Sequence, residues 1–504
     1  MKPLLPLASA ISLILSGGLL AAAVPSGNEG EKDRWWEPDE GRSFPATLDY
    51  RNEGGTLRLL LDDGPLDTKG HPFFAAIGPN GRACVTCHQP ADGMSLSASS
   101  AARQWTRKGA ADPLFAASDG SNCPSLPQQL RSSHSLLVDH GLIRIARPWP
   151  PRDPAGKSIG TDFRIEVVRD PSTCNLDPKY GLAKAGMISV FRRPRPVANF
   201  KYIEAMGFAY DPKSGMPLPV DPATGKPVSG NLMADGRVAS LEAQMRDAAS
   251  AHLGFLKNLD QQDIDRILDF ERRLYVAQQI DRTGGALDAA GAMGGPRMLQ
   301  ISKAGRLGSD GGIPVWSEFE AWEKTPEAEK RKLAPEVRAF RDSVARGARV
   351  FRDKTFLITD TAGINSPIGF GNPVRNSCVF CHNMSYMGMD VAPGQVDLGT
   401  TNAPFADPAP HLPLFRVTCL GKPHPHYGKT ILTSDPGFAL TTGKCADVGR
   451  ITLQTMRGLS ARAPYFSNGS AKDLGGVIDY YERRYNIGYT EQEKQDLVNL
   501  MRAL

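Results

Sequence analysis

Two short cysteine motifs constrain this chain more than any other feature of its sequence. The segments Cys84–His88 and Cys378–His382 read CVTCH and CVFCH, and Cys-x-x-Cys-His is the attachment signature of c-type haem. Each thiol of such a pair can form a thioether to a haem vinyl group, and the adjacent histidine then lies under the ring as the proximal iron ligand. With 8 cysteines and 9 histidines in 504 residues, about 0.002 such motifs are expected by chance. The sequence therefore predicts haem attachment at Cys84, Cys87, His88, Cys378, Cys381 and His382, with His88 and His382 binding iron.

The alternative interpretation is one zinc site made from both cysteine pairs. It leaves the two trailing histidines unexplained. A zinc ribbon also joins its pairs through a short loop, whereas Cys84 and Cys378 are 294 positions apart. The spacing favours haem.

The N-terminus has the pattern of a secretory signal. Lys2 precedes an apolar run from Leu4 to Leu20, and three alanines ending at Ala23 follow, which predicts cleavage after Ala23. The competing interpretation is an uncleaved anchor that uses the same run. We expect a periplasmic or secreted protein, with no stable membrane insertion after cleavage. Lys and Arg number 59 against 54 Asp and Glu, so the charge balance gives no reason to expect a nucleic-acid partner.

The other four cysteines lie outside the haem motifs, and in an oxidising compartment they are expected to form disulfides. The pairing Cys123–Cys174 with Cys419–Cys445 keeps each bridge within its own half of the chain. Each bridge would then contribute roughly 3 to 4 kcal/mol. Free thiols are the alternative.

The length predicts more than one domain. We expect a mainly α fold of two cytochrome c-like haem domains with long loops and a small β-containing insertion in the first. The expected boundaries are a signal peptide at 1–23, an N-terminal haem domain at 24–282, a Gly-rich connection at 283–330 and a C-terminal haem domain at 331–504.

Apolar spacing predicts the main elements. Phe163, Ile165 and Val167 alternate as in a strand, and helical spacing covers 241–248 and 264–274. In the second half, a helical stripe runs over 337–351. A capping box at 490–493 opens a last helix that reaches residue 504.

Two segments resemble the bacterial di-haem cytochrome c peroxidases and their relative MauG, which oxidises residues of a partner protein. In the first, residues 456–504, Arg457, Ala463-Pro464-Tyr465-Phe466, Asn468-Gly469-Ser470, Leu474 and Val477 resemble the family block R…APYFHNGS…L..V. In the second, Asp235-Gly236-Arg237, Leu241 and Gln244 resemble WDGR…L..Q. The chain departs from these blocks at two positions. Ala234 stands where the family has a Trp placed between the haems, and Ser467 stands where the first block has its His. The resemblance leaves residues 142–200 and 211–230 largely unmatched.

The resemblance implies that peroxide reacts at the first haem. The family places a Gln and an acid–base Glu in this region, and Gln244 and His252 lie eight positions apart on one predicted helix. His252 could replace the Glu, take a proton from hydrogen peroxide and return it to the leaving oxygen. It could instead bind the iron and block it, or be a buried structural histidine.

At the second haem, Tyr481 stands where the peroxidases carry a distal Met ligand and MauG carries a Tyr. A thioether ligand raises the haem potential, whereas an anionic oxygen stabilises oxidised iron. The alternative is that Tyr481 packs in the core beside Tyr480. Met456, Met387 and Met389 are alternative ligands.

Three functions remain open. The first is an exported di-haem oxidoreductase that reduces hydrogen peroxide at the first haem, with electrons relayed from a small donor protein through the second. The second is MauG-like oxidation of a protein residue or organic substrate by high-valent haem iron. The third is a non-enzymatic electron carrier. The cofactors expected are two covalent c-type haems, and the resemblance also implies a calcium ion bound through backbone oxygens and an Asn.

Overall fold

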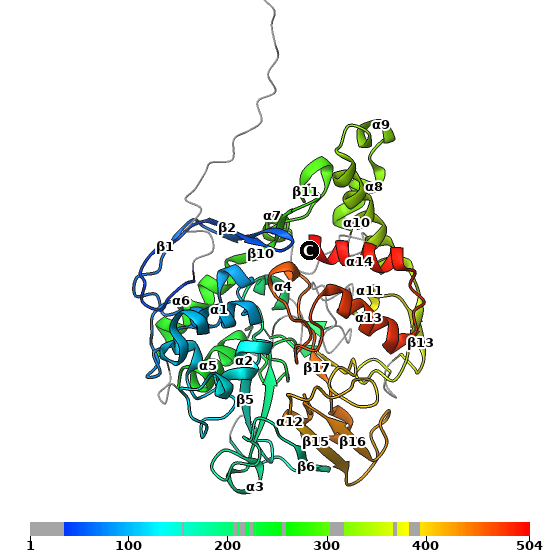
Figure 1. The fold of residues 1–504 in the computed structure, drawn as a ribbon. Helices are drawn as coiled ribbons and strands as arrows, with labels where there is room; N and C mark the ends of the chain where they lie inside the picture. The colour runs from blue at the N-terminus through cyan, green and yellow to red at the C-terminus, as the bar shows by residue number, and fades with distance from the viewer. Residues whose placement is uncertain are drawn as a thin grey trace, which may run out of the picture.

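The computed structural model describes residues 35–153, 156–204, 209–210, 217–218, 220, 225–226, 228–254, 259–302, 317–365, 370–382 and 394–504. The expected signal segment, Met387 and Met389 lie outside the described residues. Figure 1 shows two groups of helices side by side, with small sheets above and below them.

The fold is mixed α/β, and the expectation of a mainly α protein was wrong. The structure is 35% helical and 18% strand, and its described strands form seven small sheets. The expectation gave too much weight to the helices that flank haem motifs. Leu57, Leu59 and Leu61 are buried while the residues between them are less so, and this period of two is the pattern of a half-buried strand.

The first core is built on a four-stranded antiparallel sheet. Its strands, in spatial order, are β11 (Gly285–Ala286), β10 (Leu274–Asp281), β3 (Gly55–Leu61) and β2 (Thr47–Asn52). Leu59 of β3 lies opposite Val276 on one side and Leu48 on the other. The helices whose buried residues share this core are α4 (Phe200–Ile203), α5 (Leu241–Leu253), α6 (Gln261–Arg272) and α7 (Pro296–Ile301).

Side-chain caps set where α5 and α6 begin. Ser240 accepts a hydrogen bond from the Ala243 amide, and Asp260 accepts one from Asp263, which satisfies otherwise unpaired amides of the first turn. The predicted helix at 241–248 is confirmed. The one predicted at 264–274 was too long, because α6 ends at Arg272 and Leu274 begins the buried strand β10.

The second core is a helical group on the right of Figure 1, made of α10 (Pro335–Asp353), α13 (Leu474–Tyr485) and α14 (Glu491–Ala503). The predicted stripe at 337–351 lies on α10, and the predicted capping box at Thr490 opens α14. The two helices approach closely at Gly347, where a Cβ would collide with the backbone oxygen of Asp496. Arg346 pairs with the Asp496 carboxylate at 2.8 Å.

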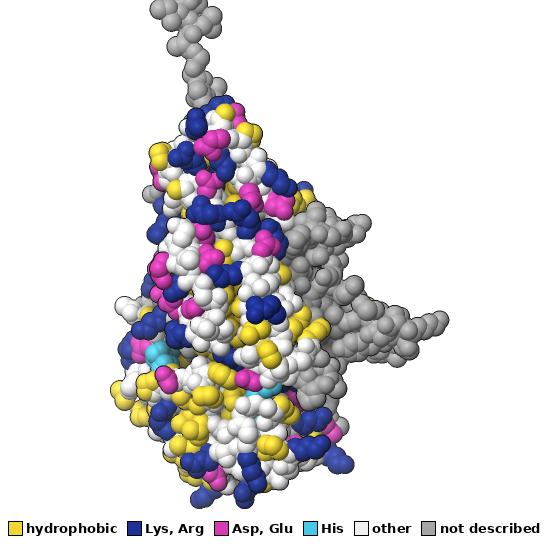
Figure 2. Space-filling view, turned by 90° about the vertical axis from the view of Figure 1, so that its right-hand side faces the viewer, with side chains coloured by type: hydrophobic (Ala, Val, Ile, Leu, Met, Phe, Trp, Pro, Cys, Tyr) yellow, Lys and Arg dark blue, Asp and Glu magenta, His cyan; other side chains and the backbone are white. Residues whose placement is uncertain are grey.

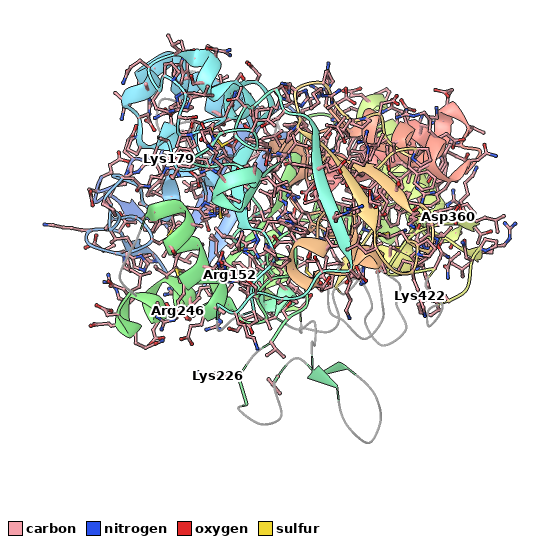
Figure 3. The ribbon with its side chains drawn as sticks, turned by 90° about the horizontal axis from the view of Figure 1, so that it is seen from below. Arg152, Lys179, Lys226, Arg246, Asp360 and Lys422 are labelled. Atoms are coloured by element: carbon pink, nitrogen blue, oxygen red, sulfur yellow. A yellow bond between two sulfur atoms is a disulfide. The ribbon has the colours of Figure 1, made fainter. Side chains whose placement is uncertain are left out.

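A three-stranded sheet joins the two halves of the chain. Its strands, in spatial order, are β16 (Thr430–Thr433), β15 (Leu414–Cys419) and β6 (Phe163–Arg169). The strand predicted at 163–167 is confirmed, and Ile165 lies opposite Val417 of the second half. Seen from below, β6 runs beside β15 (Figure 3). Both predicted disulfides, Cys123–Cys174 and Cys419–Cys445, are formed.

The remaining elements are short. The other strands are β1 (Ser43–Phe44), β4 (Leu66–Asp67), β5 (Ile143–Pro148), β7 (Met187–Arg192), β8 (Ala209–Tyr210), β9 (Pro217–Leu218), β12 (Phe356–Ile358), β13 (Val374–Asn376), β14 (Gln395–Val396) and β17 (Ile451–Thr452). The other α-helices are α1 (Ala98–Lys108), α2 (Ser135–His140), α3 (Leu182–Ala185), α8 (Glu320–Lys324), α9 (Glu327–Lys330), α11 (Val379–His382) and α12 (Ala439–Thr442). β5 and β7 pair antiparallel, and β7 leads directly to Arg193.

The described part of the expected connection carries packed elements. β11, α7, α8 and α9 all fall within 283–330, and Trp322 of α8 is buried with its indole bonded to the Ala289 carbonyl at 2.9 Å. On the face drawn in Figure 2, acidic and basic side chains are interspersed. Among the described residues, no helix is long and apolar enough to cross a bilayer.

Candidate functional site

The structure contains two large cavities, and each is lined by one of the haem motifs. The lining of the first includes Cys84, Cys87, His88, Gln244 and His252. The lining of the second includes Cys378, Cys381, His382 and Tyr481. The structure therefore brings the six motif residues together in two separate groups, with Gln244 and His252 beside the first motif and Tyr481 beside the second.

The first motif forms a tight 3₁₀ turn over Cys84–Thr86. The amides of Cys87 and His88 both bond to the Cys84 carbonyl, at 3.2 and 3.0 Å. Nδ1 of His88 lies 3.1 Å from the Met94 carbonyl oxygen. If that nitrogen carries the proton it donates there, and Nε2 is left with the lone pair that a proximal iron ligand needs.

The four motif cysteines are free thiols in buried surroundings. None of the four forms a disulfide, and burial raises the pKa of the Cys87 thiol and of the Cys381 thiol to about 12. A zinc site would need these sulfurs as thiolates. The two pairs also line different cavities, and no cluster of three or more potential ligands for a metal ion occurs in the part of the chain that the structure describes. The cavities fit two thioether-linked haems better than one shared zinc ion.

His252 is held by a buried carboxylate that the sequence analysis missed. Nδ1 of His252 contacts Asp119, which also pairs with Arg82. Arg82 in turn donates to the carbonyls of Pro113 and Leu114, at 2.7 and 2.6 Å. Burial raises the pKa of Asp119, but Arg82 and His252 outweigh this, and the pKa falls to about 2. Asp119 is therefore ionised, which makes Nδ1 of His252 the donor and leaves Nε2 as the basic nitrogen.

Two further polar groups line the first cavity. Gln244 lies on α5, eight positions before His252 and on nearly the same face of the helix. The Oε1 atom of Gln244 has no hydrogen-bond partner among the described residues. Glu271 of α6 also lines it, with Oε2 similarly without a partner there, and burial raises the pKa of Glu271 to about 8. The sequence analysis missed Glu271, although a charged residue on the apolar face of a helix was a readable signal.

The second motif is a comparable turn at α11. The amides of Cys381 and His382 bond to the Cys378 carbonyl, at 3.2 and 3.1 Å. The Phe351 ring from α10 packs edge-on against His382, with the centroids 5.5 Å apart. The hydroxyl of Tyr489 lies 3.7 Å from the sulfur of Cys378.

Tyr481 of α13 lines the second cavity, and its neighbour Tyr480 does not. Tyr480 instead donates its hydroxyl to the Leu398 carbonyl at 2.7 Å. Burial raises the pKa of Tyr481 well above its ordinary value, and nearby Tyr485 raises it further. Met456 and Ser467 line the same cavity, so Met456 keeps its place as an alternative ligand.

The two cavities share two lining residues, Arg193 and Thr455. Ala234, where the family Trp was expected, lines the first cavity, and its carbonyl accepts a hydrogen bond from Thr452 at 2.9 Å. The calcium ion implied by the resemblance stays a prediction.

Comparison with known proteins gives a partial sequence match and distant structural ones. No family model matches the chain. It is 30% identical over 149 residues to the cytochrome-c peroxidase IdrP1 of Pseudomonas sp. (strain SCT), a match that covers 26% of this chain and 37% of that relative. The chain thus matches little more than a third of the relative's length.

Two solved structures are similar at low identity. A MauG-like protein associated with microbial copper homeostasis is 12% identical, with a TM-score of 0.33 over 86% of this chain and 87% of that one. The hydrazine synthase of Kuenenia stuttgartiensis, pressurised with xenon, is 14% identical, with a TM-score of 0.27 over 62% and 73%.

Proposed function

We propose that this chain is an exported oxidoreductase that reduces hydrogen peroxide in the first cavity, and its partial match to a cytochrome-c peroxidase supports the proposal. Two electrons and two protons convert one peroxide molecule into two water molecules. The electrons would come from a small donor protein through the second cavity. The observation that carries the proposal is the group His252–Asp119–Arg82, placed in the cavity that also holds Cys84, Cys87 and His88.

The first cavity has the parts that peroxide cleavage needs. When bound there, a haem would supply the redox-active iron at which peroxide is reduced. Nε2 of His252 would accept a proton from one peroxide oxygen and return it to the other, which leaves as water. Asp119 would hold the imidazole in the right tautomer and stabilise its protonated form. Gln244 would offer its side-chain amide to the peroxide.

The residues proposed to hold the two haems are the six of the motifs. Cys84 and Cys87 would form the thioethers of the first haem and Cys378 and Cys381 those of the second. His88 and His382 would bind the irons, and Tyr481 would be the distal ligand of the second.

The second candidate is MauG-like oxidation of a protein residue or an organic substrate. The observation that favours it is the position of Tyr481, which lines the second cavity beside Cys378 and Cys381. An anionic oxygen ligand would stabilise oxidised iron in this cavity. A peroxidase would consume a reduced donor protein with each turnover, whereas a MauG-like enzyme would modify its substrate covalently.

Intact mass and low-temperature electron paramagnetic resonance of the ferric protein test the proposal. We expect two haem increments in the mass, one fewer in Cys87→Ala, and one high-spin signal for an open first iron. Mass without haem, or with zinc, would refute the haem assignment. Low-spin signals from both haems would refute the proposed enzymatic function and favour a non-enzymatic electron carrier.

A further inference from the structure

Arg193 lies between the two cavities and lines both. It follows directly after β7 and is 5% exposed. Its guanidinium donates only to main-chain oxygens, namely those of Leu96 (2.7 Å), Arg462 and Pro464. Its Nε has no hydrogen-bond partner, and no carboxylate of the described residues forms an ion pair with it.

Two nearby arginines differ in how their charges are met, because Arg192 has carboxylate partners and Arg195 has none among the described residues. Arg192 bonds to Asp435 at 2.6 Å and to Asp235 at 2.8 Å, so its charge is balanced. Arg195 lines the first cavity and, like Arg193, donates only to main-chain oxygens, those of Thr452 and Leu453 at 2.8 Å. Burial and the charge of Arg462 lower the pKa of Arg193 to about 9.

One acid whose charge acts on Arg193, Asp92, is already engaged in other hydrogen bonds. Asp92 is buried and accepts hydrogen bonds from the Ser97 amide at 2.9 Å and the Ser100 hydroxyl at 2.8 Å, and burial raises its pKa. A buried cation without a counter-ion is strongly unfavourable. An anion that enters the cavities would therefore remove a large cost, and it has to reach Arg193 from within one or both of them.

We propose that Arg193 binds a propionate of each haem and so bridges the two groups. Each haem carries two propionates, so two haems bring four carboxylates to the cavities. Of the five N–H donors of a guanidinium, three are taken here by main-chain oxygens, and Nε–H and one N–H of Nη2 are left, enough for one charge-assisted hydrogen bond to each of two carboxylates. The inference rests on the proposed function, because it needs a haem in both cavities.

The bridge would have two consequences for electron transfer. A positive charge beside both haems favours their reduced forms, because reduction adds an electron. The hydrogen bonds from one guanidinium to both propionates also give a short connected route in the region where Ala234 leaves the family Trp missing.

Redox titration of the purified two-haem protein tests the proposal, with Arg193→Gln as the neutral variant and Arg193→Lys as the variant that keeps the charge. In Arg193→Gln, the ferrous-to-ferric ratio of both haems at a fixed potential should fall about tenfold, equivalent to 59 mV for one electron. Arg193→Lys should show a smaller shift. The matched control is Arg341→Gln, since Arg341 is buried, donates to the Gly284 carbonyl at 3.1 Å and lines neither cavity. It should leave both ratios unchanged.

A shift at only one haem, or at neither, would overturn the bridge. If Arg193→Gln fails to fold, resonance Raman spectra of the native protein and Arg193→Lys decide, because an ammonium cannot reproduce the forked contacts. The propionate bending bands of both haems should differ between the two proteins, and identical bands would overturn the proposal. A protein with fewer than two haems would refute the proposed function, whereas two haems with unchanged potentials would refute only the role of Arg193.

Discussion

His252 depends on a partner 133 positions away in the chain. Asp119 fixes its tautomer, and Arg82 keeps Asp119 ionised. The imidazole is 25% exposed and lines the first cavity, so it is both held and accessible. In the proposed function these three residues handle protons, and their effect can be measured separately from haem binding.

Replacing His252 by Ala should slow the reaction of the first haem with hydrogen peroxide by about 10² to 10⁴, the usual contribution of general acid–base assistance. Stopped-flow absorbance of the haem band measures this rate, and haem content should not change. The matched control is His140→Ala, because His140 lines neither cavity. A faster reaction would make His252 a blocking iron ligand, and an unchanged rate would make it structural.

Replacing Tyr481 by Phe removes one hydroxyl with little change in volume. If that oxygen binds the second iron, the low-spin ferric signal of this haem should be lost and its potential should shift. Electron paramagnetic resonance and a redox titration measure both. Tyr480→Phe is the control, since Tyr480 does not line the cavity and its hydroxyl donates to the Leu398 carbonyl. An unaltered Tyr481→Phe spectrum would transfer the ligand role to Met456.

Local motifs revealed only part of the site. Cys84, Cys378 and the residues near them follow the fixed spacing that haem attachment requires. The sequence was therefore sufficient to predict that each motif forms one group. Asp119 and Arg82 belong to no motif, and the tertiary fold alone brings them to His252. Arg193 was equally hidden, because its significance lies in the missing carboxylate rather than in its neighbours along the chain.

Among the elements, the contact between α10 and α14 is the one most sensitive to a single atom. Gly347→Ala should destabilise the protein by up to about 2 kcal/mol. Ala favours a helix over Gly by roughly 1 kcal/mol, but its Cβ would collide with the Asp496 backbone, and overpacking costs typically 1 to 3 kcal/mol. Chemical denaturation followed by circular dichroism measures the change.

Gly476→Ala on α13 is the matched control for this prediction. Its Cβ would meet no atom closer than 3.5 Å, so stability should be unchanged or slightly raised. If both substitutions stabilise the protein equally, helix propensity alone decides and the close approach of the two helices has no energetic weight.

Helices with strong local signals were easier to predict than strands. The capping box at Thr490 and the Pro335–Asp353 stripe carry their signal within a few turns. The sheet around β3 depends on β10, whose residues lie more than 200 positions later. The end of α6 was missed for the same reason, because Leu274 has helical spacing but its place in the sheet decides its conformation.

At the scale of the whole molecule, the two disulfides should stabilise by amounts that follow their loop lengths. Replacing Cys123 and Cys174 by Ser should cost about 4 kcal/mol, and replacing Cys419 and Cys445 should cost about 3.5 kcal/mol, for separations of 51 and 26 residues. Thermal unfolding of each double variant measures the loss. Haem-stained gels should be unchanged, because thioethers do not depend on these bridges. A reversed order would contradict the chain-entropy explanation.

The walls of the first cavity come from distant parts of the chain, and this sets an order of events during biosynthesis. Cys84 is synthesised early, whereas Thr455, another lining residue of this cavity, is synthesised much later. Glu166 of β6 can pair with Arg416 of β15 only after 250 more residues have been synthesised. Under the proposed function, haem would have to be attached at the first motif before this wall closes around the thiols. A chain that closes without haem would leave the charge of Arg193 unbalanced, so the loaded protein should resist unfolding better than the unloaded one.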